Sequence, residues 1–454
     1  MANKNVELMR GNPETAVKKL AIPIMISMII TASYNIIDGI WIAGLGEAAI
    51  AGIGFVTPIF MILNGVSVGL GNGAASSMAR FVGAHDKENA SESAMHSLLI
   101  FLIASIALTI IILLVQEPLL KMYGANGVAL KEALNYSTPL FLGLIAFIFS
   151  NGSTGILRGE GDMKRAMYAT IVSVVLNAIF DPIFIYVIGW GAAGASISTI
   201  VSALISAVVI LYWILVKKDT YVDIHFKDFK FSNKITKNIL EVGVPSSLDM
   251  VVMSIAVALY LSFITTISGN YGVAAYTSGQ RLYLFAIMPL TAIGSAVVSV
   301  VGSAYGAKNG DYISRAQKYG AKLGILLGTT ITLILVVFSN QLATIFAYTP
   351  ETLYLVPAIA LFLQVATLSL PLTGAGMAST YFYQGIGKGV ISLAFTILRE
   401  VIFAVVLTYF FGIFLNLGLI GIWIGLASGR SVASVINYIF ARYTIKNLRK
   451  ELGT

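Results

Sequence analysis

The sequence contains no cysteine and few charged residues. Without cysteine, the chain has neither a disulfide framework nor a cysteine-based metal or redox site. Charged residues make up 11% of its 454 residues, against about a quarter in soluble domains, and 57% are hydrophobic. This balance excludes a water-soluble globular protein and indicates an integral membrane protein. Metal-binding clusters, nucleophile sets and phosphate loops are also lacking, so we expect no enzymatic activity and no cofactor.

Long apolar segments recur along the whole chain. Each is about 20 residues long or more, which is enough to cross a bilayer as a helix. A transmembrane barrel would instead show short segments of alternating polarity. The sequence therefore predicts an all-α polytopic membrane protein. Its twelve transmembrane helices are expected at residues 17-44, 48-80, 92-115, 130-157, 164-189, 193-216, 236-268, 271-305, 315-338, 352-384, 390-411 and 417-442.

The net charge of +8 is distributed as a topology signal. Most Lys and Arg residues fall on segments that are cytoplasmic when the N-terminus is inside, whereas Lys121 and Lys131 lie outside. We therefore expect a multi-pass protein of the cell membrane with both termini in the cytoplasm. Its surroundings are the lipid bilayer, and no nucleic-acid partner is implied. The three histidines, His85, His96 and His225, lie in or next to predicted inner loops and need no role in proton transfer.

The chain consists of two similar halves. The polar stretch 217-234 separates two sets of six predicted helices, and the Ala-Ile-Pro ending at Pro23 answers the Gly-Val-Pro ending at Pro245. We predict an N-terminal lobe at 1-216, a cytoplasmic linker at 217-234 and a C-terminal lobe at 235-454. Because both halves begin inside, they are parallel repeats related by a pseudo-two-fold axis along the membrane normal.

Two aspartates, Asp38 and Asp181, lie inside apolar stretches of the first half. Each follows a polar residue by four positions, Tyr34 and Asn177, so each pair shares a helix face. A carboxylate in hydrocarbon costs roughly 3 kcal/mol on insertion scales, which makes such residues candidates for function. Pro182 removes a helix hydrogen bond beside Asp181. Two neighbouring carboxylates can share one proton, and their oxygens also suit Na⁺, so the sequence leaves both ions open.

Five more charged residues fall within predicted helices of the second half: Asp249, Arg281, Arg399, Glu400 and Arg430. The interpretation we favour is mutual pairing that fixes the register of the helices. For Arg281 a second interpretation stays open, in which its charge repels cations or gates the cleft between the lobes.

The segments 34-38 (YNIID) and 176-182 (LNAIFDP), together with the paired six-helix halves, resemble the multidrug and toxic compound extrusion (MATE) transporters. The resemblance covers essentially the whole chain and is closest to the prokaryotic DinF-like branch. It implies a secondary active multidrug exporter that antiports cationic or amphipathic organic compounds against H⁺ or Na⁺ by alternating access. We expect such a protein to act as a monomer on small, drug-like molecules.

The resemblance also implies roles for individual residues. Four polar residues of the first half would form the cation-coupling site, which would also be the Na⁺ site if Na⁺ is the coupling ion: Asp38, Asp181, Asn177 and Thr199. An overlapping set would line the substrate pocket: Tyr34, Asn151, Asn177 and Thr199. Two prolines, Pro23 and Pro182, would allow helices to bend. The acid that the NorM-like branch carries on the seventh helix is replaced here by Ser254, so no C-lobe cation pocket is implied.

Two other functions remain alternatives. A lipid-linked precursor flippase of the same superfamily often has additional helices and a more basic cavity than this sequence predicts. A carrier of the major facilitator type usually has a Gly-rich inner loop with paired basic residues after its second helix, which residues 80-87 match poorly.

Overall fold

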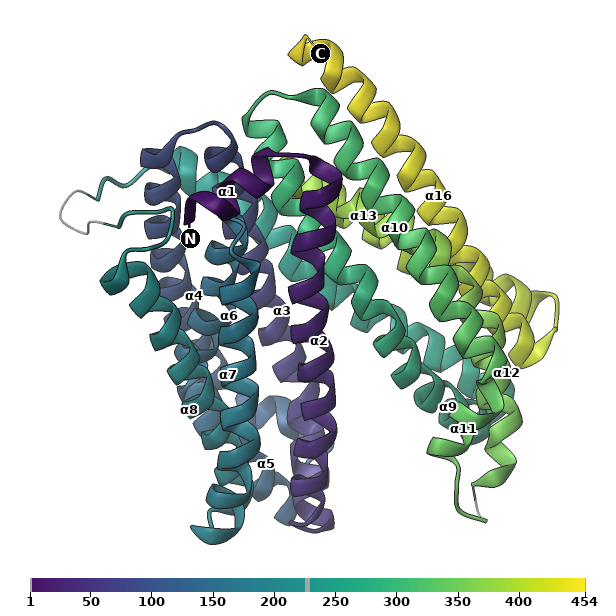
Figure 1. Cartoon of the computed structure of the whole chain (residues 1–454). Helices are drawn as coiled ribbons and strands as arrows, with labels where there is room; N and C mark the ends of the chain where they lie inside the picture. The colour runs from purple at the N-terminus through teal and green to yellow at the C-terminus, as the bar shows by residue number, and fades with distance from the viewer. Residues whose placement is uncertain (1, 225–228, 351, 454) are drawn as a thin grey trace. The chain divides into compact units, whose positions relative to one another are not determined.

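The computed structural model describes residues 2–224, 229–350 and 352–453. The elements in these ranges are all helices, and the described part contains no strand (Figure 1). This confirms the prediction of an all-α polytopic protein. Residues 225–228, which belong to the predicted linker and include His225, lie outside the described residues.

The helices of the first half of the chain follow one another with short connections: α1 (Ala2–Arg10), α2 (Pro13–Ala43), α3 (Glu47–Gly83), α4 (Lys87–Met122), α5 (Gly127–Leu142), α6 (Leu144–Gly159), α7 (Met163–Pro182), the π-helix η1 (Ile183–Val187), α8 (Gly191–Leu211) and the π-helix η2 (Tyr212–Lys217). The second half continues in the same way: α9 (Asn233–Gly306), α10 (Gly310–Val337), α11 (Ser339–Phe346), η4 (Leu353–Leu355), α12 (Val356–Ala366), η5 (Thr367–Ser369), α13 (Leu370–Gly385), α14 (Gly389–Ile397), η6 (Leu398–Val405), α15 (Val406–Tyr409), η7 (Phe410–Phe414) and α16 (Gly418–Leu452).

The predicted number of membrane spans agrees with these helices. Ten stretches of the described chain are long and apolar enough to cross a membrane, and the pair α5 and α6, bent by 53°, forms an eleventh. The 74-residue α9 contains Gly269 with φ 55° and ψ −144°, a backbone conformation that glycine adopts without steric cost. Gly269 therefore divides α9 into two spans, which gives the twelve transmembrane helices that the sequence predicts.

The chain divides into two compact units. One comprises Met1–Arg10 and Ile26–Leu248, and the other comprises Gly11–Met25 and Asp249–Thr454. We call them the N-lobe and the C-lobe. Two helices, α2 and α9, each run from one unit into the other, so the first part of α9 belongs to the N-lobe.

Glycine lets the helices of the N-lobe approach one another closely. A Cβ on Gly155 of α6 would lie 2.1 Å from the carbonyl oxygen of Gly71 on α3. A Cβ on Gly73 would lie 2.3 Å from the carbonyl oxygen of Ile239 on α9. Neither approach is possible for a larger residue without a shift of the backbone, which is why small residues mark tight contacts between membrane helices.

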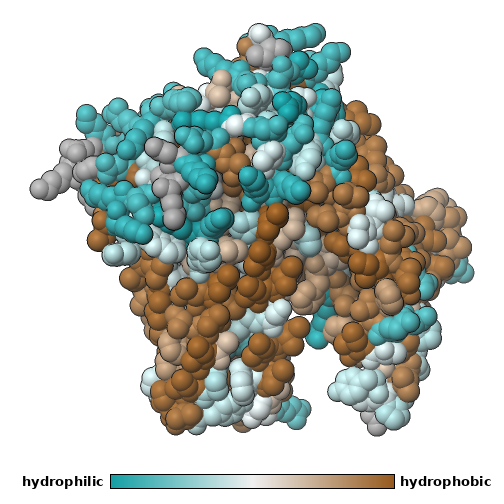
Figure 2. Space-filling view, in the orientation of Figure 1, coloured by the Kyte–Doolittle hydropathy of each residue, from teal (hydrophilic) through white to brown (hydrophobic). Residues whose placement is uncertain are grey.

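The outer surfaces of the helices are apolar. Leu114 on α4 is 75% exposed and Val187 on η1 is 81% exposed. Figure 2 shows hydrophobic residues along the lengths of the helices and hydrophilic residues near their ends. A surface of this kind is suited to contact with lipid chains.

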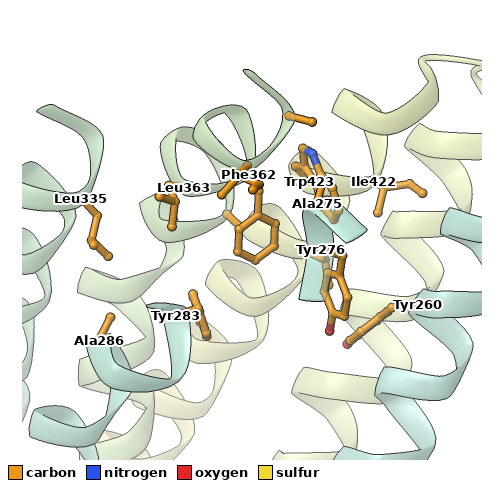
Figure 3. Close-up of a cluster of buried hydrophobic side chains, with 14 of the residues drawn as sticks. Tyr260, Ala275, Tyr276, Tyr283, Ala286, Leu335, Phe362, Leu363, Ile422 and Trp423 are labelled. Atoms are coloured by element: carbon orange, nitrogen blue, oxygen red, sulfur yellow. The ribbon is translucent and has the colours of Figure 1, made fainter. Parts of the chain in front are cut away.

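Aromatic side chains form the centre of the C-lobe core. Trp423 of α16 stacks on Tyr276 of α9, with ring centroids 6.0 Å apart, and meets Phe362 of α12 edge-on at 4.9 Å (Figure 3). All three side chains are buried. This cluster joins three helices of the lobe and borders the buried charges described below.

Candidate functional site

Asp181 lies where α7 changes its helical form. Pro182 ends the α-helix, and the π-helix η1 follows at once. Because proline has no N–H, it cannot donate to the carbonyl of Ala178 one turn earlier. Short π-helical segments of this type occur frequently at functional sites. The Asp181 side chain is fully buried, with 0% exposure.

Hydrogen bonds at Asp181 and its neighbour Asn177 join three helices of the N-lobe. The hydroxyl of Tyr34 on α2 donates to Asp181 Oδ2 over 2.9 Å, and Asn177 Nδ2 donates to Asp181 Oδ1 over 2.9 Å. The same Asn177 amide also donates to Ser198 Oγ on α8 over 2.6 Å, and Ser198 Oγ donates to the Asn177 carbonyl over 3.2 Å. Both oxygens of the Asp181 carboxyl are therefore held by neutral donors.

Asp38 completes an acid pair with Asp181. It lies one turn after Tyr34 on α2, is half-buried, and interacts with both the Tyr34 hydroxyl and the Asp181 carboxyl. Tyr136 on α5 is close enough to interact with both carboxyls. Within the described residues, no Lys or Arg neutralises either acid. Two adjacent carboxylates repel each other when both are ionised, so the pair favours uptake of a proton or another small cation.

A second contact fixes α2 beside η1. The Tyr186 hydroxyl of η1 donates to the carbonyl of Trp41, three residues after Asp38. The two rings also meet edge-on at 6.2 Å. A Cβ on Gly44 would lie 2.1 Å from the Tyr186 hydroxyl, so glycine leaves room for this contact. Helix α2 is thus joined to the α7–η1 segment both before Asp38, at Tyr34, and after it, at Trp41.

The structure brings together four of the residues that the resemblance assigns to the site, while Thr199 bonds within its own helix. Tyr34, Asp38, Asn177 and Asp181 form one network. The Thr199 hydroxyl donates to the carbonyl of Ala195 on its own helix over 3.1 Å.

Pro182 directly follows Asp181, and the other two assigned residues are Asn151 and Pro23. Asn151 Nδ2 donates to the carbonyl of Phe147, one turn earlier on α6, over 3.2 Å. Pro23 lies inside α2, in the part of that helix that belongs to the C-lobe.

Two residues near the acid pair were not identified from the sequence. Ser198 is fully buried and orients the Asn177 amide, and Tyr136 interacts with both acids. A signal for Ser198 exists in the sequence, because Ser198, Ser202 and Ser206 recur at four-residue spacing and all three are buried. That stripe indicates that Ser198, rather than Thr199, faces the interior of the lobe. We find no comparable signal for Tyr136.

The C-lobe buries a carboxylate together with cations. Arg430 Nη2 lies 3.1 Å from Glu400 Oε2, and Arg399 Nε lies 2.9 Å from Glu400 Oε1. The Tyr260 hydroxyl donates to the Glu400 carbonyl over 2.6 Å. The Arg430 guanidinium also lies 4.9 Å from the centre of the Tyr283 ring. The mutual pairing favoured from the sequence is therefore present for Arg399, Glu400 and Arg430.

The other two charged residues of that set are arranged differently. Asp249 interacts with Thr396 and with Arg399, which places it at the edge of the same network. Arg281 is exposed, and it forms no ion pair with any residue in the described ranges. Arg281 therefore takes no part in the pairing.

Comparison with known proteins gives one family and whole-chain structural matches. The MatE family model matches residues 23–183 and 245–410, one segment in each half of the chain. The probable multidrug resistance protein YoeA of Bacillus subtilis is 23% identical over 442 residues, which cover 94% of this chain and 92% of YoeA. A crystal structure of a MATE in the bent conformation is 39% identical, with a TM-score of 0.95 over 99% of both chains. One in the straight conformation is also 39% identical, with a TM-score of 0.94 over 98% of this chain and 99% of the other.

Proposed function

The chain belongs to the MatE family of membrane transporters, and from this premise we propose that it exports cationic or amphipathic organic compounds in exchange for H⁺ or Na⁺. It is a multi-pass membrane protein and not an enzyme. The observation that carries the proposal is the acid pair Asp38 and Asp181, which lies inside the N-lobe among neutral partners. A relative that covers nearly the whole chain is named as a multidrug resistance protein, which supports the choice of substrate.

In the proposed cycle the acid pair holds either the coupling ion or the export substrate. A proton or Na⁺ neutralises the shared negative charge, and a cationic compound competes for the same charge. Exclusive occupation of one site by ion or substrate is what couples their opposite movements in an alternating-access exporter. Asn177 and Tyr34 donate to the carboxylate in the ionised state, and these bonds weaken once a proton occupies it.

We propose that neutralisation of the acid pair Asp38 and Asp181 changes the shape of α2. Tyr34 and Asp38 lie on this helix, and Pro23 interrupts its hydrogen-bond ladder nearer to its N-terminal end. Loss of the Tyr34 bond to Asp181 would release the middle of α2 and let it bend at Pro23, with Pro182 giving similar freedom to α7. Structures of a similar MATE described as bent and straight support a transporter with two such states.

The remaining assignments are proposed on the same basis. Thr199 and Asn151 line the substrate pocket and can turn from their own helix carbonyls toward a bound compound. The protein works as a monomer in the cell membrane with both termini in the cytoplasm. Its repeats extend over 1-216 and 235-454, with the linker 217-234 between them.

Transport into reconstituted vesicles tests the proposal. A fluorescent organic cation is the substrate, and a pH gradient and a Na⁺ gradient are imposed separately. We expect one gradient to drive accumulation and Asp38→Asn to abolish it, because an amide cannot take up a proton and holds Na⁺ poorly. Gradient-driven transport by Asp38→Asn at the wild-type rate would exclude Asp38 as the carrier. Translocation of a lipid-linked sugar without any response to organic cations would favour the flippase alternative.

A further inference from the structure

His96 on α4 is buried in the N-lobe with both ring nitrogens engaged. Its exposure is 1%. Nδ1 lies 2.7 Å from the carbonyl oxygen of Glu92, which can only accept, so Nδ1 carries the proton. Nε2 accepts the backbone N–H of Ser232 over 2.8 Å. The arrangement is compatible only with the neutral imidazole, because a protonated ring has no acceptor.

The residue that His96 holds is the N-cap of α9. The Ser232 carbonyl accepts the N–H of Thr236, and Ser232 Oγ accepts the N–H of Ile235 over 3.4 Å. Ser232 therefore begins the first helix of the second repeat. Phe229 and Phe231, just before it, lie with their ring centroids 4.9 and 5.7 Å from that of His96. One histidine thus holds the end of the linker and the start of α9 on the N-lobe.

We propose that His96 is a pH-sensitive latch, which holds the start of α9 on α4 at neutral pH and releases it when the imidazole is protonated. Two effects oppose the protonated form. A second ring N–H would point at the Ser232 N–H, so the hydrogen bond is replaced by contact between two donors. The positive charge would also lie at the N-terminus of α9, where the helix dipole disfavours cations. Stability of the latch is therefore present at high pH and lost as the pH falls.

The elements that carry the latch or pack against them also carry charged groups. On α4, Glu92 Oε2 lies 3.7 Å from Nδ1 and favours a proton at that nitrogen, but it cannot accept from Nε2. On the linker, Asp223 is paired with Lys218, and Lys230 is exposed. On α3, Arg80 donates to the carbonyl of Asn238, which lies in the second turn of α9. In the described part of the chain, Nε2 bonds to no acidic group that could accept a second ring N–H.

Glu160 is a second titrating group on the same side of the N-lobe. Burial, with a smaller contribution from Asp162, raises the pKa of Glu160 to about 8. Its carboxylate accepts the N–H of Tyr221 in the first part of the linker. A change of pH can therefore act on the linker at two places, and the experiment has to distinguish them by position in the chain and by variant.

Hydrogen exchange of the backbone amides at 229–236 in the full-length protein tests the latch. Wild type, His96→Gln and the double variant His85→Gln/His225→Gln are compared at about pH 7.5 and about pH 5.5, the range in which histidine ordinarily changes charge. The intrinsic pH dependence of exchange is the same in all three proteins and cancels. Gln Oε1 can accept the Ser232 N–H but does not titrate, and the double variant removes the other two histidines.

We expect these amides to lose about tenfold in protection at the lower pH in wild type and in the double variant, the equivalent of one lost hydrogen bond. In His96→Gln the protection should not change with pH. Equal protection at both pH values in wild type, or a pH response that persists in His96→Gln, would overturn the proposal. Because Glu160 remains in every variant, a response confined to amides near Tyr221 would also count against it.

Discussion

The two lobes bury carboxylates in opposite electrostatic settings. In the N-lobe, Asp181 is held by Tyr34 and Asn177, which are neutral. In the C-lobe, Glu400 lies between the guanidinium groups of Arg399 and Arg430. A carboxylate that is paired with arginines of the protein needs no further cation. A buried carboxylate with only neutral donors is stabilised by binding a proton, Na⁺ or a cationic compound. This difference supports the proposal that the N-lobe couples transport to an ion, while the buried charges of the C-lobe pair with one another.

The two halves of the sequence differ at the position of Asp38. The spacing that relates Pro23 to Pro245 also relates Asp38 to Tyr260. Tyr260 donates its hydroxyl to the Glu400 carbonyl over 2.6 Å, so a polar group is kept at this place without a charge. The duplicated framework therefore does not require an acid here, which strengthens the functional interpretation of Asp38.

The largest expected effect is the loss of coupled export in Asp181→Asn. The amide keeps the size of the side chain and can still accept from Tyr34, but it cannot take up a proton or balance a cation. We expect gradient-driven accumulation in vesicles to fall to the background of empty vesicles, while thermal unfolding stays near that of wild type.

Asp249→Asn is the matched control, since Asp249 also lies in a membrane span but in the other lobe and beside Arg399. Export by this variant should continue under the same gradient. If Asp249→Asn also abolished export, the division of roles between the lobes would be wrong.

Breaking the C-lobe pair should lower stability instead of coupling. Arg430→Met leaves Glu400 buried with Arg399 as its remaining cation and removes the contact with the Tyr283 ring. Loss of one partner from a buried pair costs about 3–5 kcal/mol, so the unfolding transition in detergent should shift clearly downward. The double variant Arg430→Met/Glu400→Gln should recover part of that loss. An Arg430→Met protein of normal stability without transport would show that this pair works in the cycle.

Much of this picture follows from the sequence, and the rest depends on tertiary contacts. Long apolar segments, the repeat and the two acids predict the helical fold and the centre of the site, because span length and the cost of buried charge are local properties. On α8 the resemblance implies Thr199 as a member of the coupling site, which stays a prediction, and the structure adds Ser198, which bonds to Asn177. Adjacent residues on a helix point about 100° apart, so the choice between them needs the orientation of α8 in the lobe. Tyr136 comes near the acids only through the packing of α5, which no local pattern encodes.

Ser198 and Thr199 allow a finer test of the N-lobe site. Ser198→Ala removes the acceptor for one Asn177 N–H and leaves that donor buried, which costs about 1–3 kcal/mol. We expect a severalfold loss of maximal export and recovery in Ser198→Thr. Thr199→Ala removes only a bond to the carbonyl of its own helix and should change coupling less. Equal effects of the two alanine variants on export, measured at several ion concentrations, would show that Thr199 contributes to ion coupling as much as Ser198 does.

The smallest expected effects come from the two tyrosines that contact buried acids. Tyr260→Phe removes one hydrogen bond in the C-lobe and should lower unfolding stability by about 1 kcal/mol without changing the ion dependence of transport. Tyr34→Phe removes a donor that stabilises ionised Asp181, so the site should take up its coupling ion more readily and release it more slowly. Export measured over a range of ion concentrations should thus reach half-saturation at a lower concentration in Tyr34→Phe and at the wild-type value in Tyr260→Phe. If the half-saturating ion concentration also changed in Tyr260→Phe, the buried acid Glu400 would take part in ion binding. The Tyr260 hydroxyl is neutral and bonds to Glu400, whose charge is already compensated by two arginines, so its loss should not otherwise change the ion dependence.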